Sequence, residues 1–334
     1  MKFVVTGGAG FIGSHLAARL AEFGHDVLAF DNLSSGNPDN VSAVQAALPE
    51  GSGTLALIEA DILDADALAS AMSDCDAIFH QAAVASVPRS FADPARSLRA
   101  NVEGTAVVLE CARAMEIRTV VMASSSSIYG DTPTLPKHEA MPRTPMSPYA
   151  LSKAVDEQLL EMWTRTYGMR TAGLRYFNIF GPRQDPNSEY AAVIPKFITR
   201  MMRGESPVIY GDGMQSRDFT YIDNAVAANL RAAGLDPATG ESEDTASEPR
   251  FVAANIGIGE RYTLLDVVTQ LNDILGTSIE PIFEAGRIGD VRDSQAAIDV
   301  AREEFGYTPL VSFREGLERT VASFRDVGQT RATA

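Results

Sequence analysis

The first half of the chain alternates short apolar runs with segments whose apolar residues recur at helical spacing. This alternation is typical of parallel strands joined by crossover helices. The expected strands are Phe3–Thr6, Asp26–Phe30, Leu55–Glu59, Ala77–His80, Thr119–Ala123 and Thr171–Tyr176. The expected helices include Ile12–Phe23, Ala65–Ser73, Pro94–Met115 and Tyr149–Tyr167. The pattern predicts an α/β protein with a Rossmann-type doubly wound parallel sheet, in which ligands bind where the strands end.

The pattern becomes less regular after about Asn178, where prolines and glycines are frequent. We expect residues 1–178 to form the sheet domain and residues 179–325 to form mainly a smaller C-terminal α/β region over the ligand edge, without a strict boundary between them. Residues 326–334 are expected to form a tail. The stretch Leu235–Arg250 has almost no apolar content, so it is predicted to be an exposed, mobile loop.

Three glycines lie between the first expected strand and the first expected helix. Gly7, Gly10 and Gly13 permit a tight turn and let a pyrophosphate approach the backbone N–H groups of the helix N-terminus. Asp31 follows Gly13 by 18 residues, at the end of the second strand. Its carboxylate would accept hydrogen bonds from a ribose 2′-hydroxyl and repel a 2′-phosphate. This spacing predicts a dinucleotide site for NAD rather than NADP.

The ends of the third and fourth strands supply further candidates for the cofactor site. Asp61 and Ile62 end the third strand, where they could meet an adenine edge. Gln81, Ala82 and Ala83 follow the fourth strand, and the small alanines let a cofactor approach the backbone.

A tyrosine and a lysine stand four residues apart in the run SPYALSK, at the start of the fourth expected helix. At this spacing Tyr149 and Lys153 share one face of a helix, about one turn apart. A phenol ionises only near pH ~10, and an ammonium one turn away stabilises its phenolate. This pattern alone is common in ordinary surface pairs, but the serine run 124–127 at the end of the fifth strand adds a hydroxyl. Together these groups predict proton transfer beside a nicotinamide.

Composition restricts the partners. The net charge is −16, with 44 acidic and 28 basic residues, which disfavours nucleic acid and anionic membranes. No apolar run is long enough to span a bilayer, and the N-terminus enters a strand without the features of a signal peptide, so a cytoplasmic protein is expected.

The two cysteines, Cys75 and Cys111, and the four histidines match no metal-ligand spacing. His80 is expected to pack as a strand residue.

Seven longer motifs extend these patterns from Thr6 to about Tyr307. They are TGGAGFIGSHL (6–16), DNLSSG (31–36), NVEGT (101–105), SSSSIYG (124–130), SPYALSK (147–153), LRYFN (174–178) and GDG followed by SRDF (211–219). Together they resemble the extended short-chain dehydrogenase/reductase family, and within it the UDP-hexose 4-epimerases. The branch acting on UDP-N-acetylglucosamine is similar at QAAVASVPRS (81–90), RQDPNSEYAAVIPKF (183–197) and SRDFTYIDN (216–224). The resemblance implies bound NAD, a UDP-sugar substrate and a homodimer.

The resemblance also implies the residues that act on and hold these ligands. Tyr149 would be the acid/base on the sugar 4-hydroxyl, Lys153 would bind the nicotinamide ribose, and Ser125 would relay the proton or hydrogen-bond the 4-oxygen. The implied NAD contacts are Gly7, Gly10, Phe11, Ile12, Gly13, Asp31, Asn32, Ser35, Gly36, Asp61, Ile62, Gln81, Ala82, Ala83, Asn101, Ser124, Tyr149, Lys153 and Tyr176. The implied UDP-sugar contacts are Ser86, Ser125, Ser126, Tyr149, Asn178, Ala192, Val193, Tyr210, Arg217, Arg287, Asp290 and Ser294.

Within the substrate set, the implied roles divide by chemistry. Asn178 would meet a phosphate, and Arg217 and Arg287 would clamp the diphosphate with their forked guanidinium groups. Asp290 would accept from the uridine ribose. The uracil pocket would be lined by Ala192, Val193 and Tyr210, and Ser126 would touch the sugar or the nicotinamide.

One position bears on the size of the sugar. The family places a residue against the 2-substituent at Ser294, where a tyrosine would crowd an acetamido group and a serine leaves room. The sequence therefore favours UDP-N-acetylglucosamine and UDP-N-acetylgalactosamine, with UDP-glucose and UDP-galactose as a second pair. Ser294 as an ordinary helix N-cap is the alternative interpretation.

Other activities remain open on the same scaffold. A UDP-glucuronate 4-epimerase would need a cation facing C6, for which Arg89 is the candidate. A 4,6-dehydratase or a uronate decarboxylase is disfavoured, because Ser126–Ile128 stands where those enzymes carry acidic residues. A net dehydrogenase would release NADH. A non-catalytic NAD-binding regulator is a distant alternative, since the serine, tyrosine and lysine are all present.

An acidic, lysine-poor surface predicts stabilisation by salt. Only four of the basic residues are lysines, and carboxylates stay hydrated and repel one another less when screening is strong. We expect the melting temperature to rise in molar KCl or NaCl, as followed by circular dichroism. A melting temperature that falls as salt is added would contradict this prediction.

Overall fold

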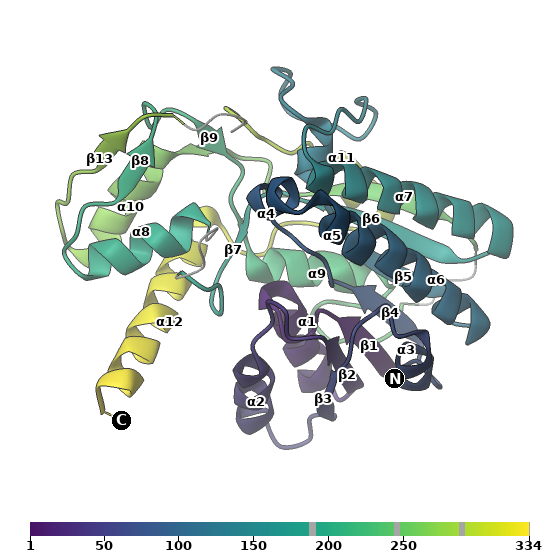
Figure 1. Cartoon of the computed structure of the whole chain (residues 1–334). Coiled ribbons are helices and arrows are strands. Elements are labelled where there is room, and N and C mark those ends of the chain that lie inside the picture. The colour runs from purple at the N-terminus through teal and green to yellow at the C-terminus, as the bar shows by residue number, and fades with distance from the viewer. Residues whose placement is uncertain (187–191, 244–247, 287–290, 334) are drawn as a thin grey trace.

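The fold is a parallel sheet covered by helices on both faces, with a smaller region along one edge (Figure 1). The computed structural model describes residues 1–186, 192–243, 248–286 and 291–333. The sheet has seven strands in the order β11-β6-β5-β4-β1-β2-β3, and every pairing is parallel. Its strands are β1 Lys2–Thr6, β2 Asp26–Asp31, β3 Leu55–Glu59, β4 Ala77–His80, β5 Thr119–Ser125, β6 Arg170–Tyr176 and β11 Phe251–Ile256. This topology confirms the predicted Rossmann-type fold.

All six strands expected from the first half are present, with ends shifted by at most two residues. The seventh strand, β11, comes from the second half and pairs with β6 from Thr171 opposite Phe251 to Tyr176 opposite Ile256. The sheet is therefore completed by a segment beyond residue 178.

Residues of β1 show how the sheet is buried on both faces. Phe3 and Val5 belong to the core on the side of α1 (Phe11–Glu22), whereas Val4 belongs to the core on the side of α6 (Gly104–Ala114). Successive side chains of a strand point to opposite faces, so a strand covered on both sides reads as a continuous apolar run. The remaining helices of this part are α2 Pro38–Ala47, α3 Ala65–Ala71, α4 Val87–Ala92, α5 Pro94–Leu98 and α7 Pro148–Tyr167.

Helix α7 carries the tyrosine and the lysine, and its start is set by local sequence. The Ser147 hydroxyl accepts a hydrogen bond from Ala150 N at 3.1 Å, and Pro148 occupies the first turn, where its missing N–H is not needed. Gly168 ends the helix at φ 70°, in the left-handed region. The helix predicted from the SPYALSK run is confirmed.

The long helix expected over Pro94–Met115 is interrupted. A π-helical turn, Arg99–Glu103, joins α5 to α6. Such a turn widens the helix by one residue and commonly lies near functional sites. Here it directs Asn101, which is fully buried, toward α7.

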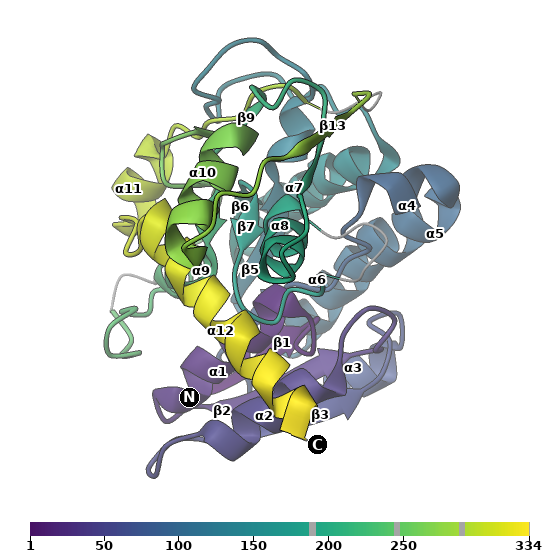
Figure 2. The same cartoon turned by 90° about the vertical axis from the view of Figure 1, so that its left-hand side faces the viewer.

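The second half builds a smaller region beside the sheet edge (Figure 2). Its helices are α8 Val193–Met202, α9 Ile222–Ala232, α10 Leu264–Leu275, α11 Asp299–Phe305 and α12 Phe313–Thr333. Its short strands are β7 Ile179–Phe180, β8 Val208–Tyr210, β9 Ser216–Arg217, β10 Thr220–Tyr221, β12 Tyr262–Thr263 and β13 Ile282–Glu284. Helix α9 packs against α1, β6 and β11, so this helix covers the sheet itself. No helix among the described ranges is both long and apolar enough to cross a membrane.

The stretch Leu235–Arg250, predicted to be an exposed loop, is exposed only in part. Part of the predicted exposed loop, Leu235–Glu243, is a turn packed against the sheet domain: Leu235 is buried, and His25 Nε2 lies 2.9 Å from the Gly240 carbonyl oxygen. Polar composition did not prevent burial, because the turn closes on its own backbone hydrogen bonds. Residues 244–247 lie outside the described ranges. The residues expected to form a tail are helical as far as Thr333, as the end of α12.

A buried ion pair holds α7 against the sheet. Glu157 of α7 is fully buried and accepts from Arg175 of β6 at 2.9 Å (Nε) and 2.8 Å (Nη2). It also accepts from the Ser124 hydroxyl of β5 at 2.6 Å and pairs with Arg143 at 3.0 Å. Both oxygens of the Glu157 carboxylate therefore have donors. A buried charge is tolerated only when it has such partners.

Replacing Glu157 by glutamine should strongly destabilise the fold. The variant leaves the Arg175 guanidinium buried without its counter-ion, which costs roughly 3–5 kcal/mol. Urea unfolding followed by circular dichroism measures the change in the free energy of unfolding. The matched control is Glu161→Gln on the same helix, whose carboxylate is 42% exposed and lies 3.8 Å from Arg165. An equal, small loss for both variants would contradict this account.

Candidate active site

A cavity of about 350 Å³ opens at the carboxyl ends of β1, β2, β4 and β5. The structure brings seventeen of the predicted cofactor residues to its wall. They are Gly7, Gly10, Phe11, Ile12, Gly13, Asp31, Asn32, Ser35, Asp61, Ile62, Gln81, Ala82, Ala83, Ser124, Tyr149, Lys153 and Tyr176. Sequence reasoning missed Phe30, Ser34, Val84, Ala85, Ala100 and Ala123, which also line it. Ser34, Val84 and Ala85 lie within the motifs DNLSSG and QAAVASVPRS, which could have indicated them.

The glycine turn fits a cradle for a pyrophosphate. Gly7 has φ 68°, and a Cβ there would lie 2.7 Å from Ala82 N. A Cβ on Gly13 would lie 2.1 Å from the Gly7 carbonyl oxygen. Side chains at these positions would fill the turn, so only glycine keeps the backbone N–H groups of the α1 N-terminus open toward the cavity. The residues present therefore fit a dinucleotide cofactor.

Asp31 organises this end of the cavity. One carboxylate oxygen accepts from Ala9 N at 3.0 Å and the other from Leu33 N at 2.8 Å. Burial raises the pKa of Asp31 above its ordinary value, and these backbone hydrogen bonds oppose the rise. Gly36 does not line the cavity; a Cβ there would lie 2.8 Å from the carboxylate of Asp31. The glycine thus leaves room for the Asp31 carboxylate, and its predicted contact with NAD stays a prediction.

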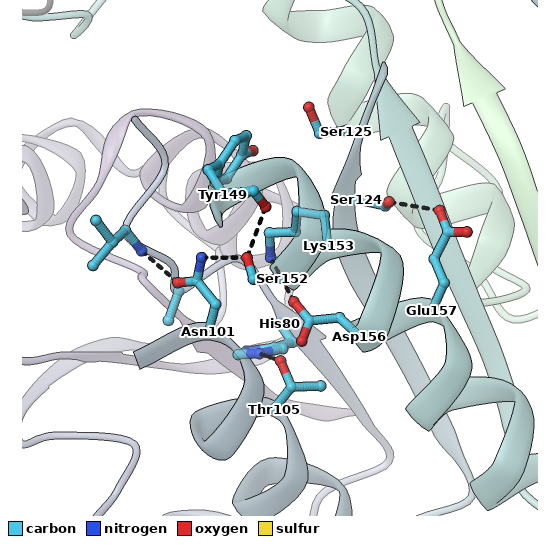
Figure 3. Close-up of polar contacts among 12 residues, drawn as sticks. His80, Asn101, Thr105, Ser124, Ser125, Tyr149, Ser152, Lys153, Asp156 and Glu157 are labelled. Atoms are coloured by element: carbon cyan, nitrogen blue, oxygen red, sulfur yellow. Dashed lines mark hydrogen bonds and ion pairs between the residues drawn. The ribbon is translucent and has the colours of Figure 1, made fainter. Parts of the chain in front are cut away.

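Asn101 also acts through its neighbours rather than at the cavity wall. Its Oδ1 accepts from Val84 N at 2.8 Å, and its Nδ2 donates to Ser152 Oγ at 2.8 Å (Figure 3). Ser152 Oγ donates in turn to the Tyr149 carbonyl oxygen at 2.8 Å. The side-chain amide therefore links a cavity-lining loop to the first turn of α7. Asn101 is absent from the cavity wall that the described residues form, and its direct contact with the cofactor stays a prediction.

Tyr149 and Lys153 border the cavity together on one face of α7, beside the end of β5 (Figure 3). Lys153 is buried, and its Nζ lies 3.3 Å from Asp156 Oδ2. Ser124 turns its hydroxyl toward Glu157, whereas Ser125 Oγ accepts from Ser127 Oγ at 2.9 Å. Neither Ser125 nor Ser126 is part of the cavity wall that the described residues form.

His80 lies beneath this site. Its Nδ1 is 2.7 Å from Thr6 Oγ1 and its Nε2 is 3.0 Å from Thr105 Oγ1. Burial, with a smaller effect from the Lys153 ammonium, lowers the pKa of His80 to about 3. The imidazole is therefore neutral at physiological pH and packs as a strand residue, as predicted.

A side-chain network closes the far wall. Tyr176 Oη donates to Gln81 Oε1 at 3.1 Å and accepts from Asn229 Nδ2 at 2.7 Å, while Gln81 Nε2 donates to Asn229 Oδ1 at 3.0 Å. Burial raises the pKa of Tyr176 to about 12, so its phenol stays protonated. Asn229 of α9 was not predicted, because nothing near it in the sequence resembles a ligand motif.

A second cavity of about 230 Å³ lies in the smaller region. Four predicted substrate residues line it: Asn178, Ala192, Val193 and Arg217. Arg217 Nη1 donates to the carbonyl oxygens of Ser216 (2.9 Å) and Arg292 (2.7 Å). Further lining residues are Ile179, Phe180, Ile194, Gln215, Phe219 and Leu264. An amide, a guanidinium and an apolar wall in one hollow suit a nucleoside diphosphate.

Other predicted substrate residues lie near this cavity or away from it. Ser294 is buried, and its Oγ accepts from Asn178 Nδ2 at 3.2 Å. It is not a helix N-cap, because the next helix starts at Asp299. Tyr210 is outside the wall, but its carbonyl oxygen accepts from Gln215 Nε2 at 2.7 Å.

Three predicted residues remain. Ser86 lines neither cavity; its hydroxyl caps α4 by accepting from Arg89 N at 3.3 Å. Arg287 and Asp290 lie outside the described residues.

Comparison with known proteins agrees with this site. Residues 3–244 match the NAD dependent epimerase/dehydratase family, so the chain belongs to this family and NAD is its cofactor. It is 38% identical over 332 residues (98% of this chain, 100% of the relative) to a UDP-glucose 4-epimerase of Mycolicibacterium smegmatis. A UDP-N-acetylglucosamine 4-epimerase from Methanobrevibacter ruminantium, solved with UDP-N-acetylmuramic acid, has 38% identity and a TM-score of 0.87, covering 98% of each chain. A probable UDP-glucuronate 4-epimerase of Rhizobium meliloti is 31% identical over 331 residues, 96% of each chain. The chain thus stands among the UDP-sugar 4-epimerases of the family.

Proposed function

We propose that this enzyme interconverts UDP-N-acetylglucosamine and UDP-N-acetylgalactosamine by inverting C4 through a transient 4-keto sugar, with UDP-glucose and UDP-galactose as a second substrate pair. The observation that carries the proposal is the pairing of two hollows. One is bordered by Tyr149 and Lys153, and the other by Asn178 and Arg217. The first hollow supplies groups for proton transfer, and the second supplies groups that can bind a diphosphate. This arrangement suits a sugar nucleotide that is held by its UDP.

In the proposed reaction Tyr149 takes the proton of the 4-hydroxyl and later returns it to the 4-oxygen. Lys153, one turn away, favours the phenolate and would hold the nicotinamide ribose. Ser125 would donate a hydrogen bond to the 4-oxygen. NAD, when bound, accepts the hydride of C4 and gives it back. The protein's part is to position the proton donor and to exclude water from the ketone.

Inversion requires the sugar to present both of its faces while the nucleotide stays bound. We assign the anchoring to Asn178 and Arg217, since amide and guanidinium groups bind phosphate oxygens strongly. Asn178 has φ 39°, a left-handed conformation that asparagine adopts more readily than most residues. Ser294 accepts a hydrogen bond from Asn178, and in this proposal its small side chain would leave space beside the sugar that a larger one would fill.

We also propose a cytoplasmic homodimer. Large apolar side chains are exposed on the helices beside the site, including Phe91 (61%) of α4 and Leu151 (45%) and Met162 (38%) of α7. An exposed apolar surface on packed helices suits a helical interface with a second copy. Cys75 and Cys111 are free thiols, which suits a reducing compartment.

The direct test is proton NMR of the purified protein with UDP-N-acetylglucosamine in molar salt, without added cofactor. The anomeric signal of UDP-N-acetylgalactosamine should grow to a fixed ratio. Tyr149→Phe should retain bound NAD but lose at least 10²-fold in turnover, because general acid–base catalysis contributes roughly that much. Conversion of UDP-glucuronate alone would replace the substrate assignment, with Arg89 as the residue to test. Accumulating NADH would indicate a dehydrogenase, and bound NAD without turnover of any UDP-sugar would indicate a regulator.

The role of Ser294 can be tested with Ser294→Tyr and its small control, Ser294→Ala. The bulky substitution should lower kcat/KM for UDP-N-acetylglucosamine about tenfold or more, since a ~1.4 kcal/mol loss of transition-state binding has that effect. Turnover of UDP-glucose should fall much less, which also shows that the variant is folded. The alanine variant should turn over both sugars. Equal losses for both sugars in the tyrosine variant would contradict the assignment.

A further inference from the structure

A buried carboxylate lies next to the predicted catalytic lysine. Asp156 follows Lys153 by three residues on α7, and Asp156 Oδ2 is 3.3 Å from Lys153 Nζ (Figure 3). The Lys153 side chain is 2% exposed and that of Asp156 is fully buried. The two charges therefore interact with little solvent between them, where electrostatic effects are large.

Among the described residues, the titratable groups nearest this pair are neutral or already paired. His80 of β4 is neutral, and Thr105 of α6, 3.0 Å from His80, carries only a hydroxyl. Tyr176 of β6 keeps its proton because burial raises its pKa to about 12. Glu157 of α7 is paired with Arg175 of β6 and with Arg143.

The ion pair with Lys153 favours the ionised form of Asp156. Burial raises the pKa of Asp156 to about 6, and the Lys153 ammonium opposes the rise. At neutral pH the carboxylate is charged, and the Lys153–Asp156 pair has no net charge. The field that reaches Tyr149 is thus that of an ion pair rather than of an isolated ammonium.

We propose that Asp156 is a positioning residue of this enzyme: its carboxylate holds the Lys153 ammonium beneath the cofactor cavity and sets the pH range in which Tyr149 exchanges its proton. The proposal rests on the proposed function, in which Tyr149 is the acid/base. Neither the tyrosine–lysine spacing nor the cofactor motifs require a carboxylate at this position.

The proposal predicts the direction in which the pH–activity profile should move. A negative charge makes every neighbouring group hold its proton to higher pH. Removing the charge of Asp156 should therefore let both Tyr149 and Lys153 lose their protons at lower pH. The acid and the alkaline limbs of the pH–activity profile should move down together, by about one pH unit. A residue that only supported the fold would lower activity at all pH values and leave the limbs in place.

The experiment compares Asp156→Asn with Asp156→Ser, in the full-length enzyme with its NAD. Asparagine keeps the shape of the side chain, and serine leaves space for a water molecule beside Lys153. Both remove the same charge, so both should show the same downward shift of kcat/KM limbs. Bound NAD, measured by absorbance, reports that the site is intact. The control is Glu161→Gln, which removes an exposed carboxylate from the same helix and should leave both limbs unchanged.

A second readout does not depend on the substrate. Titration of the tyrosinate ultraviolet band, as the difference between each protein and its Tyr149→Phe counterpart, gives the ionisation midpoint of Tyr149 directly. This midpoint should also fall in both Asp156 variants. An enzyme that turns over no UDP-sugar but shows this shift would overturn the proposed function and keep the role of Asp156.

The proposal would be overturned if both variants kept the limbs of the native pH–activity profile and the native ionisation midpoint of Tyr149 within error. It would also be overturned by failure of both variants to fold and hold NAD, because Asp156 would then be required for the fold rather than for proton chemistry. A shift in the asparagine variant alone would also overturn it, since the effect would follow packing rather than charge.

Discussion

The buried pair between Glu157 and Arg175 is the interaction on which the geometry of the site depends. It fixes α7 to β6, and α7 carries both Tyr149 and Lys153. Arg175 also donates to Tyr129 Oη at 2.7 Å, and Tyr129 donates to Asn255 Oδ1 of β11 at 2.6 Å. A single network therefore joins the catalytic helix, the serine turn and the outermost strand. A buried network of this kind specifies one arrangement because each member left unpaired would be costly.

The same network explains why neighbouring serines have different surroundings. Ser124 belongs to β5 and gives its hydroxyl to Glu157, so it serves the attachment of α7. Ser125, one residue later, has the opposite strand orientation and bonds only to the turn that follows. Because side chains alternate along a strand, the hydroxyls of Ser124 and Ser125 point in different directions. The first holds α7 in place, and the second is the one that the proposed mechanism directs toward the sugar.

The sequence predicted the sheet well because its buried strands are short apolar runs, and it placed the glycine turn, Asp31, Tyr149 and Lys153 at one edge. It did not predict β11, whose run FVAANI contains a polar Asn255 that is buried through hydrogen bonds with Tyr129, the 137–139 segment and Ala297. It also did not predict the π-helical turn that places Asn101 against Ser152 of α7. Both differences arise from contacts between segments far apart in the chain, which periodicity does not record.

In the proposed function the two cavities have different tasks. One binds the nucleotide, and the other carries out proton transfer beside the cofactor. Asn178 contacts Ser294 and the Asp218 carbonyl oxygen (3.1 Å), so the cavity proposed for the nucleotide is stiffened by hydrogen bonds between distant segments. Asp218, fully buried, accepts from the backbone N–H groups of Ile258, Gly259 and Ala296 and holds these segments together. The cofactor cavity has small residues such as Ala82 and Ala83 in its wall instead. In the proposed function, firm binding of UDP with space around the hexose would let the sugar turn over while its anchor stays in place, as inversion at C4 requires.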